Sequence, residues 1–544
     1  MSSLSGIDGS GLIGKTAAPP LRTTRHTGAV TLLDDLLSRP VMMLCGAALL
    51  LRVIAMCVVP LIPEEAYYWM YAQHADPSYF DHPPMVAWVI RLGTLLFGDS
   101  ELGVRAVGAV LMVASSALAY RLGAAWFTRA AGVAAAILIQ ALPVYFGIGL
   151  VAPMDATLCC FWLACLVCVT EALRSERPGY WYLAGAAMGA ALLTKYTAIF
   201  LPAGVVLAVA GNRRWRHHLR TPYPYAGVAL GLLMFSPVVY WNAEHGWASF
   251  RFQFSERYAR DTFNLRTPLL FLVGQLLVLT PIVLAAAWVA ARRGLRATHR
   301  SDGHWFALAC ALPGLAAAAW TSLRSDVHVN WTPPILLSVL PAACATAFAL
   351  DRLRARRGQA RKWSAQLHTT VAVCAAVMLA MMLYLLILQP RLRLLPAFGP
   401  WHDVATVVEE QEDRLEAQTG RPPRIIGDGK YQLASVIAFY RMPIEAHPGE
   451  VIQHTTSQWV MGREGLGYRF WSTMEDWEGV DVIYVSDDKD FLAEIKPYFE
   501  SIEVIDDARL RQSRQYHVAV GHRLLPARAV SRTRNSAGRS TGPA

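Results

Sequence analysis

Long apolar runs recur along this chain and constrain its fold more than any other feature. A helix needs roughly 20 apolar residues to cross the hydrocarbon layer of a membrane, and runs near or above that length return from Val41 to about Leu388. The chain has 544 residues, of which 54% are hydrophobic and only 17% are charged. The core of a soluble domain could not bury so much apolar chain. We therefore expect a polytopic α-helical membrane protein.

Hydropathy predicts about eleven membrane-spanning helices, which share the length and apolar character of such segments. They cover residues 41–60, 101–122, 131–148, 153–173, 180–194, 197–211, 224–241, 267–291, 304–320, 331–350 and 369–389.

Basic clusters between these segments predict their orientation, because loops rich in Lys and Arg stay in the cytoplasm. The clusters lie around 121–129, 174–177, 213–220, 292–300 and 352–362. A single helix over 180–211 would place the basic loop 213–220 outside, so we favour a hairpin that turns near Thr194 and Lys195. The net charge of +10 follows from these clusters, and nucleic acid is not a predicted partner.

The composition divides the chain into four parts. Residues 1–40 read as a disordered cytoplasmic tail and 526–544 as a disordered basic tail, and 41–392 form the transmembrane part. Between them, 396–525 contain strand-like runs at RIIGD, DVIYVSD and QYHVAV and a helical run at LASVIAFY, which predict a small extracytoplasmic α/β domain. All nine cysteines lie in apolar segments, so a disulfide framework or zinc finger is not expected.

The first outer loop, 61–100, concentrates ionisable residues at a membrane boundary. It reads IPEEAYYWMYAQHADPSYFDHPPM, with Glu64 and Glu65 first and then Asp81 and His82. Such residues are costly there unless they are used or solvated. The alternative interpretation is a solvated interfacial loop with an aromatic belt that includes Tyr67, Tyr68 and Trp69.

Further candidates lie in the other outer segments. Asp155 follows a proline at a helix start, where a helix cap and a functional role are both open. Lys195 separates two short apolar helices, where it either snorkels to an interface or meets a buried anion. Outer loops also carry residues that contact a substrate or are simply solvated: His245, Arg251, Arg257 and His328.

The order of these motifs resembles glycosyltransferase family 39, of the glycosyltransferase C type. That family includes aminoarabinose and galacturonic acid transferases of lipid A and core, and protein O-mannosyltransferases. The resemblance runs through the acidic pair and AYYW, YFDHPP, GVR with Arg105, PMDA with Asp155, LTKYTA with Lys195, NAEHGWASFRFQ and HVNW. The family commonly has Asp-Glu where this chain has Glu64 and Glu65, which leaves the catalytic member of the pair open.

The resemblance implies sugar transfer with inversion from a polyprenyl-phosphate donor, at the periplasmic face of the bacterial inner membrane. The acceptor implied is lipid A or lipopolysaccharide core, with protein or another envelope glycan as alternatives. Such transfer needs a base for the acceptor hydroxyl and cations for the departing phosphate.

We assign these roles to residues of the outer face. Glu64 is the candidate base, with Glu65 and Asp155 as further catalytic candidates, and the phosphate-binding candidates are Arg105, Lys195 and His82. The candidate donor or acceptor contacts are Tyr67, Tyr68, His245, Arg251 and His328. A divalent cation is the one cofactor that the sequence offers, with Asp81 as its candidate ligand.

Two other classes of protein compete with this interpretation. A transporter or lipid flippase should place charges near the middle of the membrane and show internal symmetry, whereas the charges here gather at one face and no repeat is visible. A membrane-anchored binding or sensor protein needs one or two spans, not about eleven.

Overall fold

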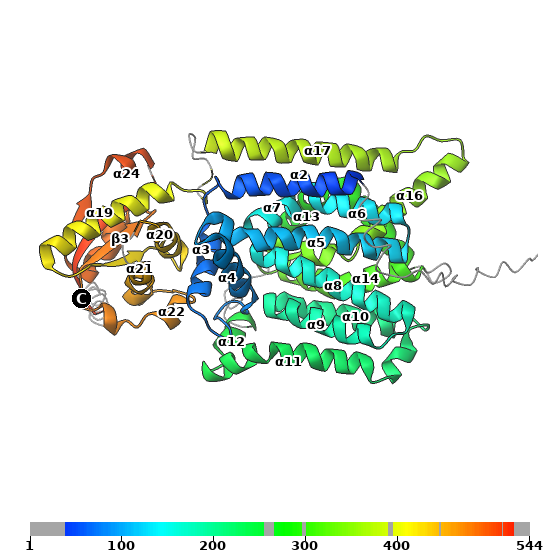
Figure 1. The fold of residues 1–544 in the computed structure, drawn as a ribbon, viewed down its shortest axis with the longest axis horizontal. Helices are drawn as coiled ribbons and strands as arrows, with labels where there is room; N and C mark the ends of the chain where they lie inside the picture. Colours follow the sequence, from blue (N-terminus) through cyan, green and yellow to red (C-terminus); the bar gives the residue numbers. More distant parts are fainter. Residues whose placement is uncertain are drawn as a thin grey trace, which may run out of the picture.

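The computed structural model describes residues 39–254, 266–295, 301–389, 395, 397–444, 448–513 and 515–526. A helical bundle occupies one side of the elongated molecule and an α/β unit the other (Figure 1). The predicted terminal tails lie outside the described residues, apart from Arg39, Pro40 and Pro526, and so does Arg257.

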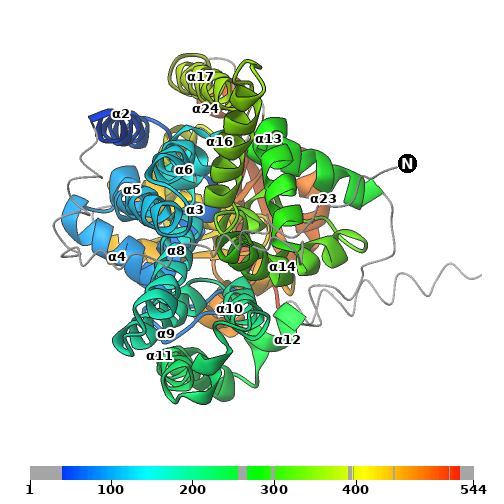
Figure 2. The same cartoon turned by 90° about the vertical axis from the view of Figure 1, so that its right-hand side faces the viewer.

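The bundle consists of helices, most of which run along the long axis of the molecule, as the end-on view shows (Figure 2). They are α2 (Arg39–Met56), α5 (Glu101–Trp126), α6 (Arg129–Ala141), α7 (Pro143–Val151), α8 (Pro153–Ser175), α9 (Gly179–Thr194), α10 (Phe200–Ala210), α11 (Tyr223–Glu244), α13 (Arg266–Leu295), α14 (Asp302–Ser322), α16 (Leu340–Arg356) and α17 (Trp363–Leu383). Large apolar side chains such as Leu233 and Trp288 are exposed on their outer faces, as lipid contact requires.

Within the described residues, five helices are long and apolar enough to cross a membrane, or up to seven if each of two bent pairs counts as one span. The first bent pair is α6 with α7, at an angle of 59°. Pro143 begins α7 and cannot continue the hydrogen bonding of α6. The second bend, of 94°, lies within α13, where Thr280 has a φ of 63° just before Pro281. Each of the eleven predicted segments contains helical residues, but hydropathy did not reveal these bends.

The chain reverses direction at Lys195, between α9 and α10. Lys195 is extended, with φ −156° and ψ 137°, and a short 3-10 turn, η1 (Tyr196–Ile199), follows it. The start of α9 and the segment after α10 meet again, since the rings of Trp181 and His218 are 5.6 Å apart. α9 also packs tightly on α11, where a Cβ on Gly185 would lie 1.9 Å from the carbonyl oxygen of Gly227.

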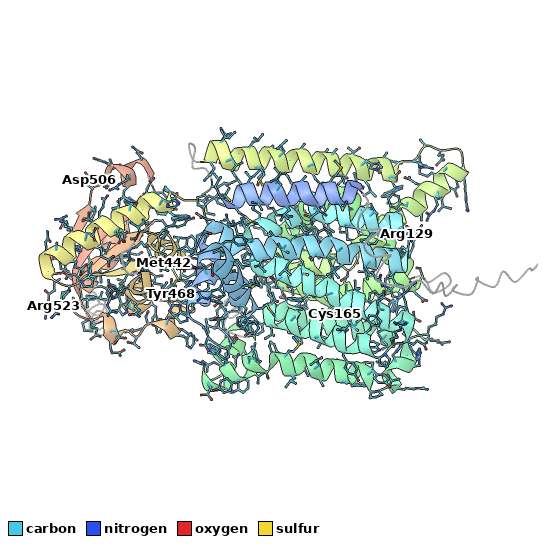
Figure 3. All side chains as sticks on the ribbon, viewed as in Figure 1. Arg129, Cys165, Met442, Tyr468, Asp506 and Arg523 are labelled. Carbon is cyan, nitrogen blue, oxygen red and sulfur yellow. The ribbon has the colours of Figure 1, made fainter. Side chains whose placement is uncertain are left out.

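Basic residues gather at the end of the bundle that lies away from the α/β unit, where Figure 3 labels Arg129. Arg174 lies over the Trp126 ring at 5.9 Å, and Arg214 pairs with Asp302 at 3.1 Å. The charges that hydropathy placed in separate loops therefore share one end of the molecule.

Two helices occupy the segment that the sequence predicted as the first outer loop. α3 (Pro63–Gln73) and α4 (Met85–Phe97) lie at the junction between the bundle and the α/β unit (Figure 1). α4 leaves Leu92, Leu95 and Leu96 exposed by 51%, 68% and 65%. An apolar stripe on a short helix beside a membrane bundle fits a helix that lies in the interface.

The α/β unit is built on one mixed sheet. Its elements are α19 (Trp401–Thr419), β1 (Arg424–Gly427), α20 (Gln432–Arg441), α21 (Pro448–His454), β2 (Thr455–Ser457), α22 (Tyr468–Trp471), β3 (Val482–Ser486), α23 (Phe491–Ile495), β4 (Phe499–Ile505), α24 (Ala508–Ser513) and β5 (His517–Leu524). The strand order is β2-β1-β3-β5-β4, with β1 parallel to β2 and β3 and with β5 antiparallel to β3 and β4. β1, β3, β5 and α20 lie where the sequence has its extended and helical patterns.

One face of the sheet shares a core with the junction helices. Ile425 and Val485 pack with α19, α20 and the buried face of α3 in one cluster. Trp69 of α3 meets Phe439 of α20 edge-on, with ring centroids 5.2 Å apart. The α/β unit is therefore packed directly against the helix that carries the acidic pair.

Candidate functional site

The acidic pair stands in the first turn of α3, which begins with Pro63 at a position that suits proline. Glu65 points inward and is buried. Its carboxylate accepts two hydrogen bonds from Arg105 of α5, from Nε to Oε1 and from Nη2 to Oε2, both at 2.6 Å. Burial raises the pKa of Glu65, and the Arg105 guanidinium acts against that rise. Such a bidentate pair holds α3 against α5.

The remaining donors of Arg105 hold the chain just before α3. Nη1 donates to the carbonyl oxygen of Val59 at 2.6 Å and Nη2 to that of Pro60 at 2.9 Å. The side chain of Arg105 is buried. We predicted Arg105 as a phosphate contact, but its donors point into the protein, so the geometry favours a structural role.

Glu64 points away from this buried pair, since consecutive residues of a helix face about 100° apart. Its side chain is exposed, and Oε1 accepts a hydrogen bond from the Tyr431 hydroxyl at 3.3 Å. The fold therefore separates the two neighbouring glutamates. Glu64 is the member of the pair that a molecule from outside can reach.

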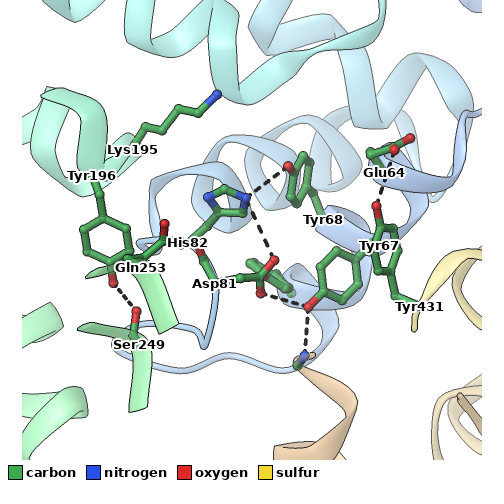
Figure 4. A network of polar contacts seen from close by, with 12 residues as sticks. Glu64, Tyr67, Tyr68, Asp81, His82, Lys195, Tyr196, Ser249, Gln253 and Tyr431 are labelled. Carbon is green, nitrogen blue, oxygen red and sulfur yellow. Dashed lines mark hydrogen bonds and ion pairs between the residues drawn. The ribbon is translucent and has the colours of Figure 1, made fainter. Parts of the chain in front are cut away.

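Asp81 is buried beside Tyr67 in the candidate site (Figure 4). The Tyr67 hydroxyl donates to its Oδ1 at 2.9 Å, and the Tyr71 hydroxyl donates to the same oxygen. Burial and the charge of Asp81 raise the pKa of both tyrosines, which keeps them protonated as donors. Gln253 Nε2 donates to the Asp81 carbonyl oxygen at 2.7 Å.

A metal role for Asp81 stays a prediction. Among the residues that the structure describes, no three His, Cys, Asp or Glu side chains gather as they would around a metal ion. A site needs several such ligands at suitable distances.

His82 and Tyr68 lie at the centre of the candidate site. His82 Nε2 is 3.9 Å from Asp81 Oδ2 and 3.4 Å from the Tyr68 hydroxyl. Burial raises the pKa of Tyr68 most, and the negative charges of Asp81, Asp155 and Glu64 raise it further. Tyr68 therefore lies near the carboxylate of Glu64 on its own helix and near two carboxylates from other segments of the chain.

Asp155 and Lys195 form a buried ion pair beside this centre. Lys195 Nζ lies 2.7 Å from Asp155 Oδ1, and Asn330 Nδ2 donates to Oδ2 at 2.8 Å. Asp155 lies in the first turn of α8, where the helix dipole favours a negative charge. Both of its oxygens bind side chains, so Asp155 acts here as the residue that holds Lys195.

Three of the five predicted donor or acceptor contacts, His245, Arg251 and His328, lie on the exposed surface. The His245 ring stacks on Trp241 at 4.1 Å, and Trp241 Nε1 donates to Asp76 Oδ2 at 2.9 Å. Arg251 is exposed on the short helix α12 (Ala248–Phe254), and His328 is exposed two residues before Asn330. None of the three is buried in the centre that contains Asp81 and Tyr68.

Sequence reasoning missed three residues of the site. Tyr431 follows β1, and side chains at the carboxyl ends of parallel strands often face ligands, a signal that was available. Asn330 stands in the HVNW motif, of which only His328 was predicted as a site residue. Gln253 belongs to a helix that the sequence did not predict, because α12 has only seven residues.

Residues 81–241, which include Asp81, Asp155 and Lys195, match the sequence profile of the family described as dolichyl-phosphate-mannose-protein mannosyltransferase. The resemblance to glycosyltransferase family 39 is confirmed. The match runs from Asp81, within the YFDHPP motif, to Trp241 near the end of α11, and leaves the α/β unit outside it.

Individual relatives match longer parts of the chain. A lipid A galacturonosyltransferase of Rhizobium johnstonii is 28% identical over 292 residues, which are 53% of this chain and 56% of that one. An undecaprenyl phosphate-alpha-4-amino-4-deoxy-L-arabinose arabinosyl transferase of Edwardsiella ictaluri is 28% identical over 332 residues, 58% of each chain. The chain thus spans somewhat over half the length of these relatives.

A solved structure extends the likeness to most of the chain. ArnT from Cupriavidus metallidurans in the apo state superposes with a TM-score of 0.61 at 16% identity, covering 89% of this chain and 98% of that one. The same protein bound to undecaprenyl phosphate superposes with a TM-score of 0.59 at 17% identity, with the same coverage. The chain therefore shares the mostly helical fold of that protein, with several membrane-length helices.

Proposed function

We propose that this chain is a membrane glycosyltransferase that moves a sugar from a polyprenyl-phosphate donor to lipid A or lipopolysaccharide core, with inversion at the anomeric carbon. The observation that carries the proposal is the exposed carboxylate of Glu64 on a firmly held helix, across the site from a buried lysine that is fixed by Asp155 (Figure 4). The relatives' names supply the substrate class, since they include transferases of sugars linked to undecaprenyl phosphate and a lipid A transferase.

The reaction begins at the acceptor hydroxyl. Glu64 takes its proton, and the acceptor oxygen attacks the anomeric carbon of the donor sugar from the side opposite the phosphate. The new carbon–oxygen bond forms as the bond from the anomeric carbon to the phosphate oxygen breaks, and polyprenyl phosphate leaves with that electron pair. A positioned base of this kind accelerates such a step by about 100-fold to 10,000-fold.

Lys195 is the best-placed cation for the departing phosphate. An ammonium has three donors, and within the described residues Asp155 takes one of them. The ion pair thus fixes the lysine while leaving it donors for a phosphate oxygen. His82, which lies between Lys195 and Tyr68 in Figure 4, is a second phosphate contact in this proposal.

The proposed topology puts this site at the outer face of the bacterial inner membrane. The basic end of the bundle faces the cytoplasm by the positive-inside rule, which directs the α/β unit, residues 396–525, into the periplasm. Eleven segments cross the membrane in this proposal, with each bent pair counted as one span and with the shorter helices α2, α9, α10 and α16 also counted as spans. The candidate residues share one end of the bundle, which fits transfer at one face better than transport through it.

A transfer assay tests the proposed function. The purified full-length chain is supplied with lipid A and with undecaprenyl phosphate linked either to 4-amino-4-deoxy-L-arabinose or to galacturonic acid. Mass spectrometry should show lipid A heavier by one sugar residue with one of the two donors. Folded protein that adds neither sugar, together with unchanged lipid A and core from cells that lack the gene, would contradict the proposal.

A further inference from the structure

The α/β unit reaches the candidate site through the loop after β1. That loop reads DGKY, and Gly429 has a φ of 80°, a conformation that suits glycine. The turn brings Tyr431 to the start of α20 and over α3 (Figure 4). The loop follows the carboxyl end of a parallel strand, the edge where α/β sheets commonly present ligand-binding residues.

Tyr431 makes two contacts with residues of α3. Its hydroxyl donates to Glu64 Oε1 at 3.3 Å. Its ring stacks on Tyr67, with centroids 4.4 Å apart and planes 25° from parallel. Tyr67 is itself fixed, because its hydroxyl donates to Asp81 and accepts from the backbone N–H of Gly467 at 2.8 Å. Tyr431 therefore packs beside Glu64 on the Tyr67 ring, which hydrogen bonds hold in place.

Two further side chains of the α/β unit fasten the backbone that leads into α3. The Tyr440 hydroxyl accepts from the backbone N–H of Leu61 at 2.8 Å and donates to Glu101 at 2.9 Å. Trp401 Nε1 donates to the Leu61 carbonyl oxygen at 2.9 Å. Leu61 lies three residues before Glu64, so both sides of its backbone are held by the same unit that supplies Tyr431.

The chemistry of this contact suits the orientation of a base. Burial raises the pKa of Tyr431, and the negative charge of Glu64 raises it further, so its hydroxyl remains a donor. A hydrogen bond to Oε1 restricts the rotation of the Glu64 carboxylate. Oε2 is then left to accept the proton of an incoming hydroxyl.

We propose that Tyr431 is a positioning residue that the α/β unit supplies to the site, where it orients the Glu64 carboxylate for proton transfer. The inference rests on the proposed function. It means that the α/β unit supplies a residue to the catalytic site. Tyr431 acts through Glu64 and does not itself take part in the transfer.

The first test is Tyr431→Phe in the full-length protein, which keeps the ring stacked on Tyr67 and removes the hydroxyl. Loss of one hydrogen bond to a charged group should lower kcat about 10-fold. kcat/KM for the undecaprenyl-phosphate-linked sugar should fall by the same factor, because the contact serves the transition state. The matched control is Tyr498→Phe, since Tyr498 is buried in the opposite core of the α/β unit, and its rates should match wild type.

The second test combines the substitution with Glu64→Gln. If Tyr431 acts through the Glu64 carboxylate, Tyr431→Phe should have no further effect on the residual rate of Glu64→Gln, measured with radiolabelled donor. An equal 10-fold loss in both backgrounds would overturn the inference, and so would a Tyr431→Phe variant with the wild-type rate. Wild-type protein that transfers no sugar would instead refute the proposed function, on which the inference rests.

Discussion

The two neighbouring glutamates show how far residue type alone determines a role. Both carry the same charge at the same membrane boundary, so the sequence could not choose between them. The choice depends on Arg105, 40 residues away in α5, which binds Glu65 through two hydrogen bonds. A partner at that separation is invisible to local pattern reading, although the GVR motif had already identified Arg105 as a residue of interest.

Glu64→Gln should lower the rate of sugar transfer by about 100-fold to 10,000-fold, because the amide keeps the shape of the side chain and removes the base. Expression and thermal stability should stay near wild type, since Glu64 is exposed. The measurement is the initial rate of the transfer assay with purified protein of checked monodispersity.

Glu65→Gln is the matched control for that substitution. It breaks the buried pair with Arg105, so we expect a lower melting temperature but a rate per folded molecule much closer to wild type. The opposite pattern, with active Glu64→Gln and well-folded but inactive Glu65→Gln, would transfer the role of base to Glu65. Full activity of both single variants and of the double variant would remove the catalytic role from this site.

Lys195→Ala should weaken transfer through its effect on the departing phosphate. It also leaves Asp155 as an unpaired buried charge, a loss that typically costs about 3–5 kcal/mol. The double variant Lys195→Met with Asp155→Asn removes that charge, so it should recover stability and still transfer slowly. Wild-type kinetics in the stable double variant would show that Lys195 has no part in phosphate binding.

At the scale of the elements, the sequence predicted apolar helices well and short or interfacial ones poorly. The reversal at Lys195 followed from charge alone, and α9 and α10 do turn there. α3 and α4 were predicted as loop, because 11 and 13 residues are too few for a crossing. β2 has three residues, and β4 is an edge strand with mostly exposed side chains, so neither carries an apolar run.

The ion pair between Glu65 of α3 and Arg105 of α5 predicts that a substitution there lowers the stability of the protein and leaves donor binding unchanged. Arg105→Gln leaves Glu65 buried without its partner and frees the carbonyl oxygens of Val59 and Pro60. Breaking a buried pair in this way costs about 3–5 kcal/mol, which should appear as a clear fall in melting temperature in detergent. A variant that keeps the wild-type melting temperature but has a raised KM for the donor would restore Arg105 as a phosphate contact.

At the scale of the whole molecule, the sequence predicted the membrane bundle and the polar outer face, but not how the α/β unit contributes to the site. Charge and hydropathy are local properties, and they place Glu64, Asp81 and Lys195 on one face without pairing them. The contacts of Tyr431 with Glu64 and of Tyr440 with Leu61 depend on docking between segments more than 350 residues apart. Docking of this kind follows from packing, as in the shared core of Trp69 and Phe439.

The orientation of the whole molecule in the membrane also needs a test, because every proposed role assumes that the site faces the periplasm. A reporter fused after Leu395 should be active outside the cytoplasm, and one fused at Trp215 should be active inside, since the basic residues 213–220 resist translocation. Alkaline phosphatase and green fluorescent protein give opposite readouts at each position, so each fusion controls the other. An external signal at Trp215 would contradict the orientation of the α9–α10 hairpin. An internal signal at Leu395 would place Glu64 and the α/β unit in the cytoplasm and remove the basis for a donor presented from the outer leaflet.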